Sequence, residues 1–276
     1  MRFLKMHGAG NDYVYINGFD EIVADPAELA IRVSNRNFGV GSDGLVIIRP
    51  SETCDFRMSM YNADGSEAEM CGNASRCVGK YVFDLGLTSK TELTLETKAG
   101  VKQLNLEIID GEVATVCVDM EEPILTPNLI PVIAEGEKAI RIPIEVGGVT
   151  YYATCVSMGN PHAVIFVDDV DRFDVHGIGR MIEIHPLFPK KTNVEFVQIV
   201  SPSLLKMRVW ERGSGETLAC GTGACATLVA AVLNNLSDRK ATLKLRGGDL
   251  QIEWRESNNR IYMTGGATKV FEGELF

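Results

Sequence analysis

The chain of 276 residues is 45% hydrophobic and 23% charged, which is the composition of an ordinary globular protein. Its formal net charge of −10 argues against a basic surface for binding nucleic acid or an anionic membrane. No apolar run reaches the roughly 18 residues needed to span a bilayer, and the N-terminal segment lacks the pattern of a signal peptide. We therefore expect a cytoplasmic protein without a membrane partner.

The first half of the chain is rich in strand-like runs and contains few helix signals. A helix is predicted after Asp25, which can cap the first turn, with Pro26 in that turn and Glu28 completing a capping-box pattern. Residues 39–44 have the glycine spacing of a dinucleotide-binding loop, but they follow a helix and precede a strand. Because that motif requires the opposite order, we predict a turn. A second helix is predicted directly after Cys71.

The middle of the chain marks a boundary. Residues 120–131 hold three of the ten prolines, and because each Pro lacks a donor and disfavours helix before it, we expect an extended connector. The second half is again strand-rich, and the helix predicted after Cys220 is apolar almost all round, as a buried helix is. We expect domains at residues 1–121 and 122–266, with the tail 267–276 packing back on the first domain.

The two halves contain an internal repeat with an offset of 149 positions, the separation of Cys71 and Cys220. The same offset superimposes three further pairs, which are Asn11 on Asn160, Gly44 on Asn193 and Asn62 on Glu211. A repeat of this length indicates two homologous halves, the alternative being halves of merely similar composition. We predict an α+β fold of two pseudo-symmetric domains, each a mostly antiparallel, barrel-like sheet wrapped round a central helix.

Each repeated cysteine stands where a helix is expected to begin. The partial positive charge at a helix N-terminus can lower the pKa of a thiol and can bind an anion such as a carboxylate. The Gly after each Cys allows a ligand to approach the backbone closely. If the two sites face each other across an interdomain cleft, a thiolate can remove a proton from a carbon while a thiol returns one to its opposite side. The sequence thus predicts inversion of a stereocentre.

Five motifs, in order along the chain, are more specific: GAGNDYV, MYNADGSEAEMCGNASRC, MGNPHAV, TNVEFV and WERGSGETLACGTGAC. Together with the tail GGATKVFEGELF, they resemble the diaminopimelate epimerase family over nearly the whole chain. The resemblance implies a homodimeric, cofactor-independent amino-acid epimerase that uses neither pyridoxal phosphate nor a metal. It further implies interconversion of LL- and meso-diaminopimelate, a step in the synthesis of lysine and of peptidoglycan.

The resemblance also implies roles for particular residues. Cys71 and Cys220 would be the acid/base pair, and His162 and Glu211 would assist the thiols and orient the substrate. Glu211 would also meet the α-ammonium group. The reacting α-carboxylate would lie against the backbone of Gly72, Asn73, Gly221 and Thr222. The distal end of the substrate would be recognised by Asn11, Asn62, Asn160, Asn193 and Arg212, whose guanidinium can pair both oxygens of a carboxylate.

Three positions depart from the family pattern. The common motif CGNGARC is CGNASRC here, and Ala74 and Ser75 are small enough to keep the helix start. Gly44 stands where some members have a Gln that touches substrate, so this chain offers only backbone there. Phe271 stands where members often have a Tyr at the dimer interface, and the expected dimer therefore lacks that hydroxyl.

Several alternatives remain open at the level of sequence. An odd number of cysteines, seven, does not suggest a disulfide framework, and their spacing does not fit a zinc site. A proline racemase or hydroxyproline epimerase would typically carry His after the first Cys-Gly and Ser-Pro before the second Cys, where this chain has Asn73 and Leu218-Ala219. An isomerase of the phenazine-biosynthesis type would lack the cysteine pair. A non-catalytic amino-acid-binding protein and a redox sensor that joins Cys71 to Cys220 are the other candidates.

Overall fold

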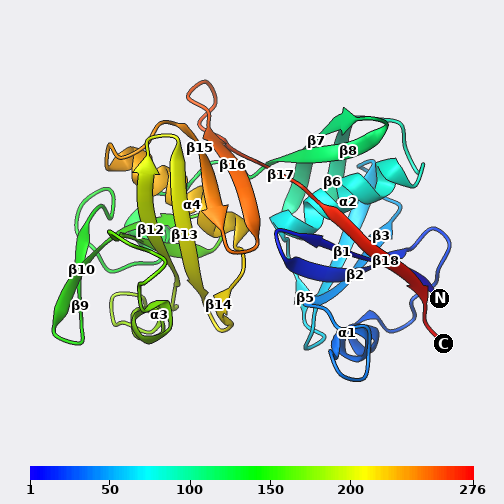
Figure 1. The fold of residues 1–276 in the computed structure, drawn as a ribbon, viewed down its shortest axis with the longest axis horizontal. Coiled ribbons are helices and arrows are strands. Elements are labelled where there is room, and N and C mark those ends of the chain that lie inside the picture. Colours follow the sequence, from blue (N-terminus) through cyan, green and yellow to red (C-terminus); the bar gives the residue numbers. More distant parts are fainter. The chain divides into compact units, whose positions relative to one another are not determined.

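The computed structural model describes residues 1–276, which divide into two compact units (Figure 1). Unit 1 consists of Met1–Asp119 and Thr264–Phe276, and unit 2 of Met120–Met263. The first division, at 119/120, lies two residues before the expected boundary at 121/122. The second, at 263/264, lies three residues before the expected boundary at 266/267.

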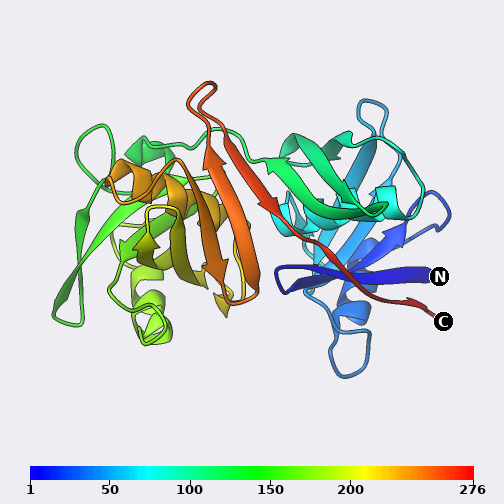
Figure 2. The same ribbon diagram turned by 45° about the horizontal axis from the view of Figure 1, so that its top comes forward.

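Unit 1 is an eight-stranded sheet with one short additional strand. In the order β18-β1-β2-β3-β4-β6-β7-β8, neighbours are antiparallel except for the parallel pairs β2–β3 and β4–β6, and β5 pairs with β4. The strands are β1 (Arg2–Gly8), β2 (Asn11–Asn17), β3 (Gly44–Arg49), β4 (Phe56–Asn62), β5 (Glu67–Ala68), β6 (Glu92–Thr97), β7 (Gly100–Ile109), β8 (Glu112–Asp119) and β18 (Thr268–Glu274). The C-terminal strand β18 runs antiparallel beside β1 (Figure 2).

Two helices belong to unit 1, α1 (Pro26–Ser34) and α2 (Gly72–Asp84). The predicted start of α1 is confirmed, since the Asp25 carboxylate accepts a hydrogen bond from the backbone N–H of Glu28 at 3.0 Å. The predicted turn before β3 is also confirmed, with Gly41 at φ +80°. Helix α2 is buried from Gly72 to Val82 and packs against β1, β7 and β8, so it is the central helix of its unit.

Unit 2 repeats this plan. In the order β9-β10-β11-β12-β13-β15-β16, neighbours are antiparallel except for the parallel pairs β11–β12 and β13–β15, and β14 pairs with β13. The elements are η1 (Pro127–Leu129), β9 (Ile142–Val146), β10 (Val149–Ser157), β11 (Pro161–Phe166), α3 (Val175–Glu183), β12 (Asn193–Ser201), β13 (Leu204–Glu211), β14 (Gly215–Thr217), α4 (Gly221–Leu233), β15 (Lys240–Leu245) and β16 (Gly248–Trp254). Strand β17 (Ile261–Gly265) spans the division between the units.

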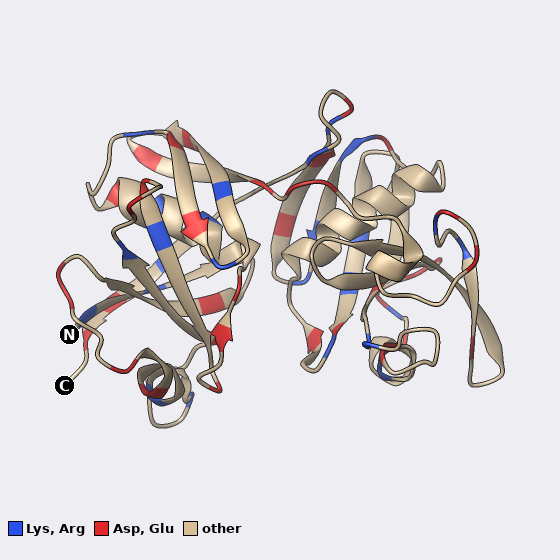
Figure 3. Cartoon of the chain, turned by 180° about the vertical axis from the view of Figure 1, so that it is seen from behind, with Lys and Arg blue, Asp and Glu red and all other residues tan.

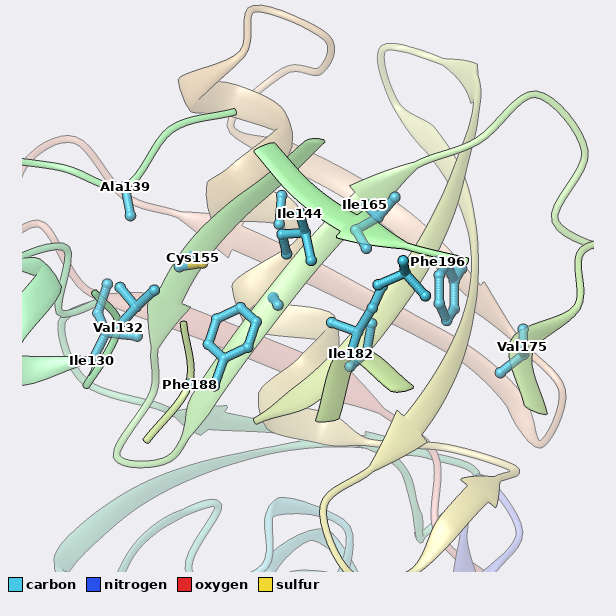
Figure 4. Close-up of a cluster of buried hydrophobic side chains, with 14 of the residues drawn as sticks. Ile130, Val132, Ala139, Ile144, Cys155, Ile165, Val175, Ile182, Phe188 and Phe196 are labelled. Atoms are coloured by element: carbon cyan, nitrogen blue, oxygen red, sulfur yellow. The ribbon is translucent and has the colours of Figure 1, made fainter. Parts of the chain in front are cut away.

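The core of unit 2 has two parts. Helix α4 is buried along most of its length, as predicted from its apolar sequence, and packs against β10, β11, β12 and β16. A separate cluster, which includes Ile144, Ile182, Phe188 and Phe196, fills the space between the sheet and α3 (Figure 4). The sheet is therefore packed on both faces.

The structure confirms the internal repeat. Strands β2 and β3 pair so that Tyr13 lies opposite Gly44, and β11 and β12 pair so that His162 lies opposite Asn193, each 149 positions later. Helices α3 and α4 begin and end 149 positions after α1 and α2. The repeat therefore preserves strand register, on which the direction of every side chain in a sheet depends.

The expected extended connector is instead part of unit 2. The backbones of Ile124 and Ser157 exchange two hydrogen bonds of 2.9 Å, and Pro127 opens the short 3₁₀ helix η1. Burial of Ile130 in the core fixes the segment further. Prolines limited the helical content here as predicted, but they did not prevent packing.

Acidic and basic positions are interspersed on the strands and loops of each unit (Figure 3), with 37 acidic against 27 basic residues in the chain. The longest helices, α2 and α4, have 13 residues each, and none has the length and apolar character to cross a membrane.

Candidate active site

Unit 1 places three of the predicted site residues together at the start of α2. Cys71 is the N-cap residue, with the extended angles φ −140° and ψ 122°. Its thiol donates a hydrogen bond to Asn11 Oδ1 at 3.3 Å, and Asn73 Nδ2 lies 3.4 Å from the same oxygen. The beginning of β2 and the beginning of α2 therefore meet at this thiol.

Asn11 is held by a charged network that the sequence did not reveal. Its Nδ2 donates to Asp43 Oδ2 at 2.8 Å, and Arg36 pairs with both Asp43 and Asp12 at 2.9 Å. Burial acts to raise the pKa of Asp12, but hydrogen bonds from Arg36 and Lys5 outweigh burial and lower it. Asp43 directly precedes β3, and the parallel pairing of β2 with β3 brings it to Asn11. Asp43 thus fixes the side chain that contacts the thiol.

A buried guanidinium holds the first turn of α2. Arg76 donates to Asn73 Oδ1 at 2.8 Å, to the carbonyl of Gly72 at 3.4 Å and to the carbonyl of Gly266 at 3.2 Å. Gly8 of β1 lies against this turn, and a Cβ there would meet the carbonyl oxygen of Asn73 at 2.9 Å. The first N–H groups of a helix have no acceptor within it, so this fixed turn can receive an anion.

The structure also places Gly44 and Asn62, which face each other across β3 and β4. A Cβ at Gly44 would lie 2.1 Å from the carbonyl oxygen of Tyr61 and 2.9 Å from the Tyr13 ring. This backbone therefore has no room for the Gln that some family members carry at this position. The amide of Asn62 donates to Ser66 Oγ at 3.0 Å, in the turn that follows β4.

Unit 2 places Cys220 at the corresponding N-cap of α4, with φ −124° and ψ 113°. The backbone N–H of Gly223 donates to its Sγ at 3.3 Å, and Thr222 Oγ1 lies 3.5 Å from it. Burial, followed by the charges of Glu211 and Glu195, raises the pKa of Cys220 well above its ordinary value. The backbone N–H of Gly223 at the helix start acts to lower the pKa, as expected, but burial and the two carboxyl groups outweigh it.

Glu211 ends β13 beside this thiol. Burial raises the pKa of Glu211, while hydrogen bonds from Thr217 and Cys220 act in the opposite direction. The Thr217 hydroxyl donates to Glu211 Oε1. The predicted pair of Glu211 and Cys220 is thus brought together, and the carboxyl group lies where it can orient a substrate or receive a proton.

His162 is fully buried on β11, and each of its two ring nitrogens has a polar neighbour. Nδ1 lies 2.7 Å from Glu195 Oε1, and Nε2 lies 3.0 Å from Asn160 Oδ1. Two predicted residues, His162 and Asn160, are therefore in contact. Glu195 was not singled out by the sequence, although it lies within the TNVEFV motif and pairs with Val164 on the neighbouring strand.

Asn193 and Arg212 meet at the same end of these strands, because Asn193 lies opposite His162 at the start of β12 and Arg212 follows the end of β13. Asn193 Nδ2 donates to the carbonyl of Pro161 at 2.8 Å, and its Oδ1 accepts from the backbone N–H of Arg212 at 2.9 Å. The Arg212 guanidinium reaches the carbonyl of Lys190 at 3.2 Å on the exposed surface. Asn193 thus shapes the turn after β13, from which Arg212 projects.

The two cysteine sites have the same plan. Each joins a thiol, a helix start and an Asn or Glu side chain, a set that can transfer a proton and hold a carboxylate. All seven cysteines are free thiols in the structure. No group of three or more His, Cys, Asp or Glu side chains has an arrangement that could hold a metal ion.

Comparison with known proteins gives a family and a fold. The chain matches the family model described as diaminopimelate epimerase over residues 3–126 and 154–270. It is 62% identical over 275 residues to a diaminopimelate epimerase of Acetivibrio thermocellus, covering 100% of this chain and 98% of that protein. It is 56% identical over 275 residues to one of Methanococcus maripaludis strain C6, covering 100% and 99%.

Solved structures share the fold at low identity. A phenazine biosynthesis protein of the PhzF family from Bacillus anthracis superimposes with a TM-score of 0.75 at 16% identity, covering 100% of this chain and 99% of that one. A hydroxyproline epimerase from Agrobacterium vitis does so with a TM-score of 0.69 at 15% identity, covering 100% and 90%. These likenesses confirm the predicted α+β fold of two similar halves.

Proposed function

Because the chain belongs to the diaminopimelate epimerase family, we propose that it interconverts LL- and meso-diaminopimelate by proton transfer between two thiols. One structural observation carries the proposal. Cys71 and Cys220 each cap the buried central helix of their unit, at positions related by the 149-residue repeat. Two equivalent acid/base groups are what inversion of one carbon requires.

The proposed reaction balances without an external reagent. One cysteine thiolate removes the α-proton and becomes a thiol, while the other thiol protonates the opposite side of the same carbon and becomes a thiolate. In one direction Cys220, whose pKa is raised by burial, would be the acid and Cys71 the base. The roles exchange in the reverse direction.

We call each cysteine, together with the helix start and the side chains around it, a half-site: one surrounds Cys71 and the other Cys220. The proposed substrate contacts follow the geometry of each half-site. The helix starts at Gly72 and Asn73, and at Gly221 and Thr222, would hold the α-carboxylate, whose charge they favour. Glu211 would meet the α-ammonium group. The distal group would be recognised by Asn11, Asn62, Asn160, Asn193 and Arg212. Asn11 also contacts the Cys71 thiol at 3.3 Å, which supports an additional role at the reacting end.

The activity is tested by incubating the reduced protein with LL-diaminopimelate and a chelator, without pyridoxal phosphate, and separating the isomers. We expect meso-diaminopimelate to accumulate to equilibrium, because the acid and the base are side chains of the protein. Proline and trans-4-hydroxyproline serve as alternative substrates. Inversion of either one, with no change in diaminopimelate, would assign the protein to the sister activity.

The proposal extends to a cytoplasmic homodimer that serves lysine and peptidoglycan synthesis. Strand β18 exposes the apolar side chains of Val270 at 52% and Phe271 at 47%, and the C-terminal Phe276 is fully exposed, which supports a self-association surface. Sedimentation should give twice the chain mass of 30.2 kDa. A single-chain mass at micromolar concentration would exclude a stable dimer.

A further inference from the structure

Glu195 is a fully buried carboxyl group with an incomplete set of hydrogen bonds. Its Oε1 lies 2.7 Å from Nδ1 of His162, which is also fully buried, and its Oε2 has no hydrogen-bond partner. A buried carboxyl oxygen without a partner is costly to the folded state. Stability alone therefore does not account for a carboxyl group at this position.

Glu195 lies under the first turn of α4, beside the thiol. A Cβ added at Gly223 would meet Glu195 Oε1 at 2.7 Å and Cys220 Sγ at 3.2 Å. The carboxyl oxygen and the sulfur therefore flank the same small volume. Helix α4 can start over Glu195 because the third residue of that helix has no side chain.

The ionisable groups around Cys220 come from four strands. Glu211 on β13 and Glu195 on β12 both raise the pKa of Cys220, after burial as the largest cause. His162 on β11 neighbours both carboxyl groups and acts to lower the pKa of Glu211. Cys155 on β10 has its pKa raised by burial and then by Glu195. The charge of Glu195 thus acts to raise the pKa of both nearby thiols, Cys220 and Cys155.

The corresponding place in unit 1 has no such carboxyl group. The 149-residue offset maps Glu195 onto Val46 and His162 onto Tyr13. Strand register is the same in both units at these positions, because Tyr13 lies opposite Gly44 and His162 opposite Asn193. Val46 is fully buried and apolar. The two half-sites are therefore built alike but differ in charge behind the thiol.

We propose that Glu195 is a positioning residue of the epimerase reaction, which holds His162 and gives the Cys220 half-site a buried negative charge that the Cys71 half-site lacks. A carboxylate only accepts hydrogen bonds, so Nδ1 of His162 donates to Glu195 Oε1, and this bond fixes the orientation of the ring whose Nε2 lies 3.0 Å from Asn160 Oδ1. The catalytic part of this inference rests on the proposed function. The effect of the Glu195 charge on the pKa of Cys220 does not depend on that function.

The test is Glu195→Gln, which keeps the shape and removes the charge. Alkylation of Cys220 by iodoacetamide is followed by peptide mass spectrometry across a range of pH. Loss of a nearby negative charge should move the midpoint of Cys220 labelling down by about one pH unit and raise its rate at pH 8 about tenfold. Labelling of Cys225, buried within α4, should stay slow in both proteins and reports any loosening of the helix.

Glu183→Gln is the matched control. Glu183 is a buried carboxyl group of the same unit that accepts hydrogen bonds from Trp210 Nε1 at 2.8 Å and from the backbone of Gly213 at 3.1 Å. Its replacement should leave the midpoint of Cys220 labelling unchanged. A shift of equal size in this control would show a general effect of weakened packing and would overturn the proposal.

Steady-state kinetics tests the positioning of His162. Because a Gln amide can donate as well as accept, it does not fix the ring, and kcat should fall about tenfold, with KM changed less than about twofold. If Cys220 in Glu195→Gln is labelled with the same pH midpoint and the same rate as in the wild type, the inference is overturned. A wild-type protein without epimerase activity would overturn the proposed function and leave the labelling result to stand on its own.

Discussion

The two cysteines have different immediate neighbours although they occupy equivalent positions. The Cys71 thiol donates to a neutral amide, Asn11, which is itself held by Asp43. Cys220 is buried beside the carboxyl groups of Glu211 and Glu195, and its pKa is raised. Burial and these two carboxyl groups therefore favour the protonated form of Cys220.

Gly44 allows a test of the packing around the first half-site. In Gly44→Ala the new Cβ would approach the Tyr61 carbonyl oxygen to 2.1 Å, so β3 or β4 must shift. Overpacking of this kind costs about 1–3 kcal/mol, and urea unfolding should show the loss. Gly266→Ala is the control, since a Cβ there has its nearest neighbour at 4.0 Å. Equal stability of Gly44→Ala and wild type would contradict the close strand packing.

Helices α2 and α4 are the elements on which both half-sites depend. Each begins directly after its cysteine, and each is buried along most of its length. In α2 the first turn packs closely against Gly8 of β1, while Arg76 holds the start of the helix. A buried helix with a fixed start keeps the thiol and the neighbouring backbone N–H groups in a constant geometry, as electrostatic catalysis requires.

The interior of α2 predicts a dependence of stability on pH. Burial raises the pKa of Cys77 to about 11, although its hydrogen bond with Tyr15 and the charge of Arg76 act to lower it. A raised pKa means that the folded state holds the thiol proton more tightly than the unfolded state does. The contribution of Cys77 is therefore complete below pH 9 and is lost as the pH rises from 9 to 11.

Cys77→Ala should remove this dependence. Between pH 9 and 11, with reductant present, the free energy of unfolding of the wild type should fall by about 2–3 kcal/mol more than that of the variant. Val78→Ala, at a buried neighbour in the same helix, also leaves a cavity but removes no titrating group, so it should parallel the wild type. Parallel curves for all three proteins would show that Cys77 does not keep its proton on folding.

At the scale of the whole molecule, the sequence predicted the features that depend on local signals. The Asp25 cap, the helix starts after Cys71 and Cys220, and the repeat were all readable from nearby residues or from a constant offset. Asp43 and Glu195 were missed because their partners lie 32 and 33 positions away, on strands whose pairing only the fold reveals. The sequence left the protonation of Cys220 open, because the effect of a helix start is local, whereas burial depends on the packing of an entire unit.

The repeat supports the proposal that two thiols, one from each half of the chain, transfer the proton of a single carbon. The most direct measurement follows LL-diaminopimelate in deuterium oxide with the wild type, Cys71→Ser and Cys220→Ser. The wild type should form meso-diaminopimelate that carries deuterium at the inverted carbon. Each variant should unfold at the wild-type midpoint yet epimerise at least about 100-fold more slowly, because it lacks one acid/base group. A wild-type rate in either variant would contradict the two-thiol mechanism.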